Sequence, residues 1–295
     1  MAYVLRRPAP TYLVKAFPSM PLSDYTITLD PGSERQRLSR QAKLFAEQIP
    51  SQVVRIAGAE IKRILDIGCG TGEVALALRR AYPTAQIIGV DRDQQCLTFA
   101  QRSLEELDVA HIEYVLGDAE SVLPEGPFDL VVASMVLSHL RRPERVLGLA
   151  HAALREGGCF WSRTCAPASR DENLIYEQRL LHVYLDAIEA ASLNVFIAPR
   201  IPALLSEAGF MGVTIEEEAY PVGGPTTQGK ELAVNIVHGA YKAKPLITGI
   251  FGTSDEVVDQ MYREAIRAVQ RSGDDLIDTQ VVVNHIAWKP PARFR

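Results

Sequence analysis

The sequence is poor in the residues and patterns that define several classes of protein. Only four of its 295 residues are cysteines, Cys69, Cys96, Cys159 and Cys165, and no two of them form a C-x-x-C pair. Structural zinc and a disulfide framework are therefore poorly supported, and a reducing cytoplasm fits this composition. No apolar run approaches the length needed to span a membrane, so we expect no membrane partner.

The chain also lacks an excess of positive charge. Its formal net charge is −5 and it contains no basic block, so we expect no nucleic-acid partner. Residues 1–24 carry three basic residues and no acid before Asp24, as transit peptides do, but four prolines interrupt any amphipathic helix there. We interpret residues 1–24 as an arm that packs on the body or on another subunit, and residues 291–295 as a short tail.

What the sequence does contain is a glycine-rich turn between an apolar strand and a helix. Residues 63–73 read Arg-Ile-Leu-Asp-Ile-Gly-Cys-Gly-Thr-Gly-Glu, so that Gly68, Gly70 and Gly72 follow a run typical of a buried strand. Such a turn lets a ligand approach the backbone at a helix N-terminus, where free N–H groups point outward. The spacing differs from the G-x-G-x-x-G fingerprint of dinucleotide-binding proteins.

Two carboxylates indicate the chemistry of the ligand. Asp66 stands directly before the turn, where it would repel a pyrophosphate but suits an ammonium or sulfonium cation. Asp91 ends the next predicted strand, at the place where such units direct a carboxylate to ribose hydroxyls. Together they favour an adenosine ligand with a cationic amino-acid tail, which is S-adenosylmethionine. The alternative is a tight turn that binds no ligand.

Residues 65–73 (LDIGCGTGE) and 89–93 (GVDRD) closely resemble the first two motifs of the class I S-adenosylmethionine-dependent methyltransferases. The resemblance covers about residues 25–290. It implies an α/β fold, a Rossmann-like seven-stranded sheet with the last strand antiparallel, plus helical lid insertions. The cofactor-binding residues that we assign are Tyr25, Gln41, Asp66, Gly68, Cys69, Gly70, Asp91, Arg92, Asp118, Ala119 and Ser134.

Two of these assignments concern the adenine ring. In the family, an acid at Asp118 accepts a hydrogen bond from the adenine amino group, and the backbone N–H of Ala119 meets a ring nitrogen. An adenine edge offers both a donor and acceptors, so the pairing is chemically sensible. The alternative for Asp118 is a turn carboxylate that caps its own loop. Tyr25 and Gln41 have an equally simple alternative as polar residues on a solvated surface.

The alternation of strand and helix patterns between residues 63 and 164 predicts a doubly wound parallel sheet. The predicted strands are 64–67, 86–91, 111–116, 127–133, 157–163, 210–219 and 278–288. The predicted helices are 33–49, 73–82, 93–107, 143–154, 171–192, 199–209, 229–241 and 254–272. Helical lid segments are expected at about 165–198 and 222–277. For the second segment, a packing or dimerisation element is the alternative, and a homodimer is left open.

His139 is the candidate catalytic residue. It follows the fourth predicted strand on the cofactor side of the sheet, because ligands in open α/β sheets bind at the carboxyl ends of strands. Its ordinary pKa suits a general base, although a histidine that only hydrogen-bonds the next helix, with proximity alone driving methyl transfer, is the alternative. His182 and His238 lie on the predicted lid helices, and the pattern of the last strand predicts His285 as a core residue.

Several patterns of the family are missing. No Asn-Pro-Pro-Tyr type sequence follows the fourth strand, no acidic cluster suggests a divalent metal, and no cysteine triad suggests soft-metal chemistry. We therefore expect an enzyme without a metal that transfers a methyl group to an O, N or C atom of a small, partly apolar metabolite, as in specialised biosynthesis.

Eight aromatic residues in the arm and lid segments suit an apolar acceptor. They are Tyr12, Phe17, Tyr25, Tyr176, Tyr184, Phe196, Tyr241 and Phe251. Two alternatives remain: an S-adenosylmethionine-binding enzyme of this fold that catalyses a cyclisation or decarboxylation, and a non-catalytic partner subunit.

Overall fold

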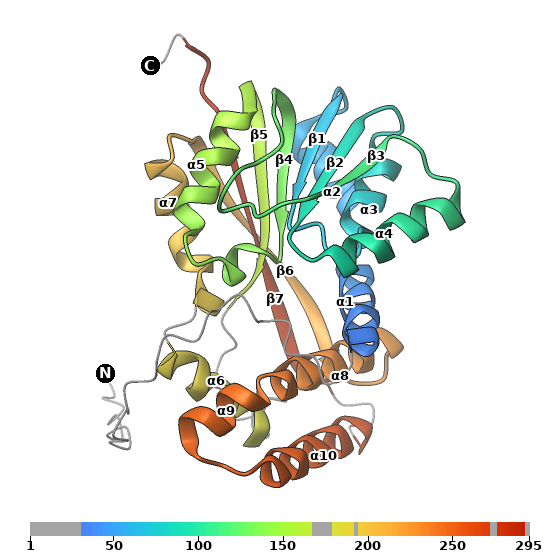
Figure 1. Ribbon diagram of the computed structural model, residues 1–295, viewed down its shortest axis with the longest axis vertical. Helices are drawn as coiled ribbons and strands as arrows, with labels where there is room; N and C mark the ends of the chain where they lie inside the picture. The colour runs from blue at the N-terminus through green and yellow to red at the C-terminus, as the bar shows by residue number, and fades with distance from the viewer. Residues whose placement is uncertain (1–30, 167–178, 192–193, 272–275, 293–295) are drawn as a thin grey trace.

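The computed structural model describes residues 31–166, 179–191, 194–271 and 276–292. Seven strands form one sheet in the order β3-β2-β1-β4-β5-β7-β6 (Figure 1). The strands are β1 (Arg63–Ile67), β2 (Gln86–Asp91), β3 (Ile112–Leu116), β4 (Phe128–Ser134), β5 (Leu154–Cys165), β6 (Met211–Gly223) and β7 (Leu276–Trp288). Strands β1 to β5 pair in parallel, and β7 is antiparallel to both β5 and β6. The predicted sheet, with its last strand antiparallel, is confirmed.

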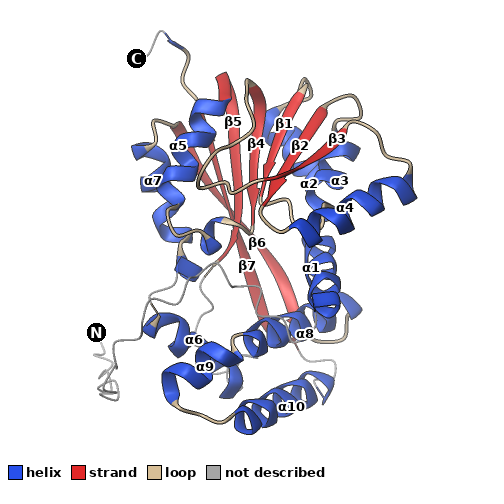
Figure 2. Cartoon of the chain, viewed as in Figure 1, coloured by secondary structure: helices blue, strands red, loops and turns tan. Residues whose placement is uncertain are grey.

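Helices cover both faces of this sheet (Figure 2). The helices are α1 (Pro31–Ala46), α2 (Ile49–Ala57), α3 (Glu73–Ala81), α4 (Gln94–Leu107), α5 (Pro143–Ala153), α6 (Arg179–Ala190), α7 (Ile201–Glu207), α8 (Thr227–Lys242), α9 (Lys244–Phe251) and α10 (Asp255–Arg271), with 3₁₀ turns η2 (Leu137–His139), η4 (Asn194–Phe196) and η5 (Ala198–Arg200). One apolar core packs α5 and α7 against the sheet, and a second packs α2 and α3 against the other face.

Local sequence sets several helix ends. Asp93 caps α4, because its side chain accepts hydrogen bonds from the N–H groups of Gln95 and Cys96. Gly209, with φ 93°, follows α7 at the predicted stop. The predicted helix 33–49 is wrong at its C-terminal end, because α1 ends at Ala46 and α2 begins at Ile49. Pro50 stands in the first turn of α2, where its missing N–H costs no hydrogen bond, and so starts a new helix.

The last two strands project beyond the rest of the sheet. Strand β5 pairs with β7 only as far as Cys165 and Val282, whereas β6 and β7 stay paired to Gly223 and Leu276. The projecting ends carry Tyr220, Val222 and Val282 into a third apolar cluster, built with α6, α8, α9 and α10. Helices α8 and α10 match the predicted pair, and α9 between them was not predicted from the sequence.

We call α1, α6, α8, α9 and α10 together the helical layer. It lies below the carboxyl ends of β1, β2 and β4 in Figure 1, on the side where ligands of open α/β sheets bind. Of the predicted segment 171–192, the structure describes α6 and its flanks; residues 171–178 lie outside the described residues. None of the helices in the described part of the chain has the length and apolar character that crossing a membrane requires.

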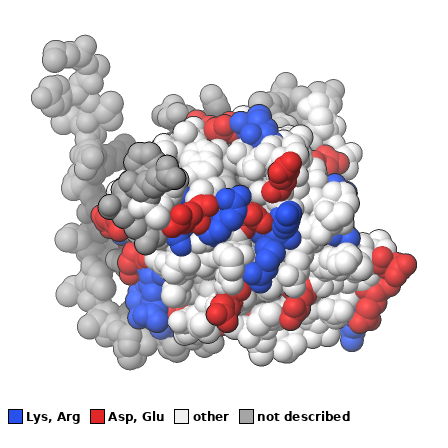
Figure 3. Space-filling model, turned by 90° about the horizontal axis from the view of Figure 1, so that it is seen from above, with Lys and Arg blue, Asp and Glu red and all other residues white. Residues whose placement is uncertain are grey.

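The opposite end of the sheet has a structural carboxylate. Asp129 accepts hydrogen bonds from the N–H groups of Lys62 and Arg63, both at 2.9 Å, and pairs with Arg155. Asp129 thus pairs with backbone at the end of the sheet far from the glycine turn. Seen from this end, acidic and basic side chains are interspersed over the visible face (Figure 3).

Candidate functional site

The glycine turn stands at the carboxyl end of β1, directly before α3. All three of its glycines have left-handed φ angles, with 51° at Gly70. A Cβ atom on Gly70 would meet nothing within 4 Å, so the turn is open at this point and a ligand can approach its backbone. At Gly68 the reverse holds, because a Cβ atom would stand 2.4 Å from Cγ2 of Val136. Gly68 therefore serves close packing, and Gly70 serves access.

Asp66 has a buried carboxylate that lacks a partner for one oxygen. The residue is 1% exposed, and within the described part of the chain Oδ2 accepts no hydrogen bond. Burial, followed by the negative charge of Asp91, raises the pKa of Asp66 to about 8. A cationic group placed at this position would lower that pKa and stabilise the ionised form. The site therefore fits the cationic tail of the predicted cofactor.

Asp91 ties the end of β2 to the glycine turn. Its Oδ2 accepts a hydrogen bond from the N–H of Gly70, and its Oδ1 accepts one from the N–H of Asp93, both at 2.9 Å. Burial raises the pKa of Asp91, although these two N–H groups oppose the shift. Each carboxylate oxygen can accept a second hydrogen bond. Asp91 can thus order the turn and still receive ribose hydroxyls.

The loop after β3 contains the two residues assigned to adenine. Asp118 is exposed, and its carboxylate accepts hydrogen bonds from the N–H of Glu120 at 2.9 Å and from the hydroxyl of Ser121 at 3.1 Å. This is the geometry of the alternative, a carboxylate that caps its own loop. Ala119 packs against the core beside β4 and β5. Contact of either residue with adenine stays a prediction.

The segment after β4 approaches the glycine turn from the other side. Ser134 ends β4 and is half-buried, and His139 ends η2 with an exposed side chain. Desolvation by the surrounding protein, followed by the positive charges of Arg92 and Arg37, lowers the pKa of His139 to about 4. The imidazole is therefore neutral at pH 7, and a catalytic role for His139 stays a prediction.

Helix α1 closes the site from the helical layer. Arg37 donates from Nη1 to Oε1 of Gln41 at 3.0 Å and to Oδ1 of Asn235 at 2.9 Å. The side-chain amide of Asn235 returns a bond to the carbonyl of Arg37 at 3.2 Å. Two residues further along α1, the Ser39 hydroxyl donates to Oε1 of Glu73 at 2.7 Å. Helix α1 thus joins α8 to the first turn of α3.

These contacts were only partly predictable. Gln41 was assigned to the cofactor, but in this structure its side chain holds Arg37, and Tyr25 lies outside the described residues. Glu73 and Asn235 were not singled out. Glu73 is the final residue of the LDIGCGTGE motif, so that motif could have identified it as a site residue. No sequence pattern indicates a role for Asn235.

The remaining histidines lie away from the glycine turn. Nε2 of His238 is 2.7 Å from the hydroxyl of Tyr262, which joins α8 to α10. Nε2 of His285 is 3.0 Å from the carbonyl of Ala198, and burial lowers the pKa of His285 to about 4. His285 is therefore the core residue that its strand pattern predicted. His182 is exposed on α6.

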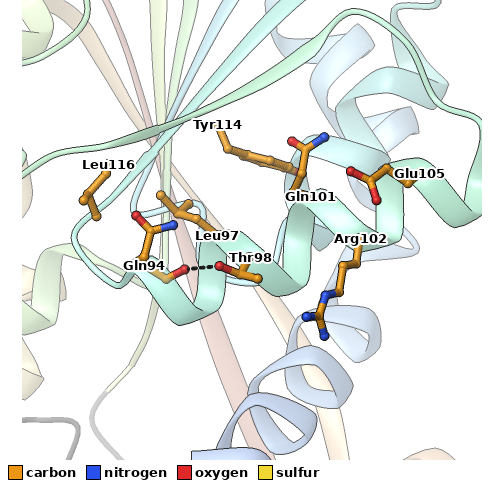
Figure 4. Close-up of a pocket in the computed structure, with 8 residues that line it drawn as sticks. All are labelled: Gln94, Leu97, Thr98, Gln101, Arg102, Glu105, Tyr114 and Leu116. Atoms are coloured by element: carbon orange, nitrogen blue, oxygen red, sulfur yellow. Dashed lines mark hydrogen bonds between the residues drawn. The ribbon is translucent and has the colours of Figure 1, made fainter.

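A shallow pocket lies at the outer edge of the sheet, between α4 and β3 (Figure 4). It is lined by Gln94, Leu97, Thr98, Gln101, Arg102, Glu105, Tyr114 and Leu116. No sequence-predicted site residue lines it. Tyr114 links the pocket to the glycine turn, since a Cβ atom on Gly72 would stand 2.3 Å from the Tyr114 hydroxyl oxygen. The described residues contain no group of three or more His, Cys, Asp or Glu placed to hold a metal ion.

Comparison with known proteins gives one family model, described as a methyltransferase domain, which matches residues 64–158. A malonyl-[acyl-carrier protein] O-methyltransferase of Paenibacillus sp. is 26% identical over 159 residues, which are 53% of this chain and 58% of that relative. The release factor glutamine methyltransferase of Escherichia coli is 34% identical over 121 residues, 41% of this chain and 40% of that protein. The chain spans about half the length of the curated relatives it matches.

Solved structures share the fold at low sequence identity. Phosphoethanolamine N-methyltransferase 2 of Haemonchus contortus, in complex with S-adenosylhomocysteine, matches with a TM-score of 0.57 and 16% identity, covering 92% of this chain and 61% of that one. The [4+2]-cyclase SpnF matches with a TM-score of 0.52 and 19% identity, covering 82% of this chain and 81% of that one.

Proposed function

We propose that the chain is a class I S-adenosylmethionine-dependent methyltransferase and that it transfers a methyl group from S-adenosylmethionine to a small, partly apolar acceptor. The observation that carries the proposal is the buried Asp66 carboxylate, with one oxygen unpartnered among the described residues, beside a glycine turn that is open at Gly70. A cationic ligand satisfies the carboxylate, and the open turn gives that ligand room.

Each residue assigned to the cofactor from the sequence has a distinct role in this proposal, and all of them except Tyr25 lie in the described part of the chain. In our proposal Asp66 neutralises the cationic amino-acid tail, and Gly68, Cys69 and Gly70 lie along it. Asp91 accepts the ribose hydroxyls, with Arg92 beside it. Asp118 and Ala119 receive the adenine, while Ser134, Gln41 and Tyr25 border the methionine end. When bound, S-adenosylmethionine supplies a methyl group that is already activated for displacement.

The protein's part in the reaction is alignment and removal of a proton. In an in-line displacement, the acceptor atom forms a bond to the methyl carbon while the carbon–sulfur bond breaks and its electron pair stays on sulfur. An acceptor hydroxyl or amine must also lose a proton. We assign this proton to the neutral imidazole of His139, whose pKa of about 4 keeps it unprotonated at pH 7.

The acceptor would enter between the carboxyl ends of the strands and the helical layer. The relatives differ in acceptor by their names, from a malonyl-[acyl-carrier protein] to a release factor glutamine, so the acceptor is not inferred from any one of them. Tyr184, Tyr241 and Phe251 pack against the apolar cluster of the helical layer, so in this structure they take part in internal packing. The other predicted aromatics lie outside the described residues or have undescribed side chains.

The likeness to a [4+2]-cyclase supports one second candidate. A methyltransferase fold that binds S-adenosylmethionine and uses its charge to promote a cyclisation would require the same Asp66 and Asp91. The two candidates differ in the fate of the cofactor: S-adenosylhomocysteine accumulates only when methyl transfer occurs. Mass spectrometry of the cofactor after turnover therefore separates them.

Calorimetric titration tests the proposal directly. We expect the purified protein to bind S-adenosylmethionine and S-adenosylhomocysteine and not NAD, whose pyrophosphate would meet Asp66. An Asp66→Asn variant keeps the volume of the side chain and removes its charge, so it should bind the cationic ligand much more weakly. Binding of NAD in preference to S-adenosylmethionine, or no loss in the variant, would contradict the proposal.

A further inference from the structure

Met135, the residue directly after β4, has an unusual backbone conformation. Its φ angle is 56°, in the left-handed region, which the described part of the chain otherwise reserves for glycines and for Asp108 and His111. Asp and His tolerate this region better than most residues, whereas an unbranched apolar side chain gains nothing from it. Such strain persists only where the surrounding structure fixes it, and it concentrates at functional sites.

Contacts with β5 hold Met135 in this conformation. Its N–H donates to the carbonyl of Arg163 at 2.8 Å, which continues the pairing of β4 with β5 by one residue. Its Sδ lies 3.8 Å from Sγ of Cys165. Arg163 is fully buried, and its Nη1 donates to the carbonyl of Phe45 at 2.7 Å. The anchor of Met135 is thus itself fixed to α1.

Met135 stands between two parts of the site. The next residue, Val136, lies so close to the glycine turn that a Cβ atom on Gly68 would approach its Cβ to 2.7 Å and its Cγ2 to 2.4 Å. The Met135 side chain points elsewhere and packs against the apolar cluster of the helical layer. One residue therefore contacts the layer through its side chain and sets the position of Val136 through its backbone.

We infer that Met135 is a positioning residue that couples the helical layer to the glycine turn. Its left-handed backbone places Val136 against Gly68. Its side chain packs against the apolar cluster of the helical layer. A displacement of the helical layer would therefore change the position of Val136 against the glycine turn. The role of this coupling in catalysis rests on the proposed function, in which the glycine turn binds S-adenosylmethionine. The mechanical coupling itself does not depend on that function.

Three substitutions separate the backbone role from the side-chain role. Met135→Val introduces a β-branched side chain that opposes a left-handed φ, whereas Met135→Gly accepts that φ and removes the side chain. His111→Val is the matched control, because His111 has a φ of 67° and is exposed at the start of β3, at the opposite end of the sheet. It introduces the same strain remote from the site.

The first readout is amide hydrogen exchange of the peptide 66–72, measured by mass spectrometry without any ligand. We expect exchange about tenfold faster in Met135→Val than in the parent, and changes within about twofold in Met135→Gly and His111→Val. In Met135→Gly the faster exchange should instead appear in the helical layer, in peptides of α6 and α8. Equal effects of Met135→Val and His111→Val, or an undisturbed layer in Met135→Gly, would overturn the inference.

Two further measurements keep the test decisive. Should Met135→Val fail to fold, Val136→Ala removes the contact with Gly68 without backbone strain, and unchanged exchange of the turn in that variant would overturn the coupling. The second readout is calorimetric affinity for S-adenosylhomocysteine, which we expect to fall about tenfold in Met135→Val and to stay within about twofold in His111→Val. A parent protein that does not bind this probe would refute the proposed function, while the exchange data still decide the coupling.

Discussion

The sheet and the helical layer differ in how far apart in the sequence their contacting residues stand. The glycine turn and its two carboxylates fall between Asp66 and Asp91, within one strand–helix–strand unit, and Val136 reaches the turn from the segment after β4. In the helical layer, Arg37 bonds to Asn235 from 198 residues away, and Phe45 meets Tyr220 edge-on at 4.8 Å between ring centres. The glycine turn is therefore built mainly from residues close together in sequence, whereas the helical layer depends on long-range contacts.

The glycine turn and the helical layer should therefore respond differently to changes in the sequence. A local motif keeps its chemistry when distant segments change, because the strand, turn and helix that form it are continuous in sequence. The helical layer can vary its surface without disturbing Asp66 or Asp91, provided that the joints between the sheet and the helical layer remain. Arg163, Met135 and the contact of Ser39 with Glu73 are such joints.

The largest effect at the glycine turn is expected for Asp66→Asn. This variant should lose affinity for S-adenosylmethionine and gain free energy of unfolding. The pKa of Asp66 is about 8 in the folded protein against 3.8 for the ordinary group, so the folded state holds a proton that the unfolded chain releases. The contribution of Asp66 to stability is therefore fully present at low pH and is lost as the pH rises from about 4 to about 8. Asparagine carries no charge at any pH, so we expect the variant to be more stable at pH 9, by up to about 5 kcal/mol.

Urea denaturation at pH 5, 7 and 9 measures this effect. The matched control is Asp129→Asn at the other end of the sheet, where the carboxylate accepts two backbone hydrogen bonds and pairs with Arg155. That variant should lose stability at every pH tested. A loss of stability in both variants would mean that Asp66 has partners in solution and is not held for a ligand.

The joint between the sheet and the helical layer is tested by Arg163→Met. The guanidinium is fully buried and donates to the Phe45 carbonyl, to Glu218 at 3.1 Å and to the Tyr220 hydroxyl at 3.0 Å. Methionine fills the volume but leaves the Glu218 carboxylate without its cation, so we expect a loss of about 3–5 kcal/mol in the free energy of unfolding. Adding Glu218→Gln should recover part of this loss.

Unfolding of the Arg163→Met variant also shows whether the sheet and the helical layer unfold independently. In that case Arg163→Met would lower the stability of the helical layer alone, and fluorescence and circular dichroism would report separate transitions. One shared transition, shifted in the variant, would show that the network makes the sheet and the helical layer cooperative.

Asp91→Ala tests the second motif through binding. Loss of the hydrogen bonds to both ribose hydroxyls should weaken affinity for S-adenosylmethionine by about 1.5–3 kcal/mol, measured by calorimetry. Asp93→Ala is the matched control, since Asp93 caps α4 through the N–H groups of Gln95 and Cys96. It should cost stability and leave affinity unchanged; equal affinity losses in the two variants would remove Asp91 from the site.

The same division explains what could be predicted from the sequence. The alternation of strands and helices and the glycine turn followed from patterns of a few residues, because hydrophobic period and glycine spacing act locally, whereas the antiparallel last strand followed from the family resemblance. The break at Pro50 and the short helix α9 were not predicted, since propensity alone does not fix where tertiary packing ends a helix. The partners of Arg37 and the backbone of Met135 had no local signal at all.

A final and smaller effect concerns the edge strand, where α2 meets β6 through an exposed ion pair. Arg55 forms two hydrogen bonds with Glu216, one of them at 2.8 Å, but 58% of the Arg55 side chain stays exposed. Solvent screens such a pair, so a double-mutant cycle of Arg55→Ala and Glu216→Ala should give a coupling energy of only about 0.2–1 kcal/mol, smaller still at high salt. The pair joins two elements 161 residues apart, as Arg163 joins β5 to distant residues. A coupling as large as that of Arg163 would show that distance in sequence, and not burial, determines how strongly a contact holds its two elements together.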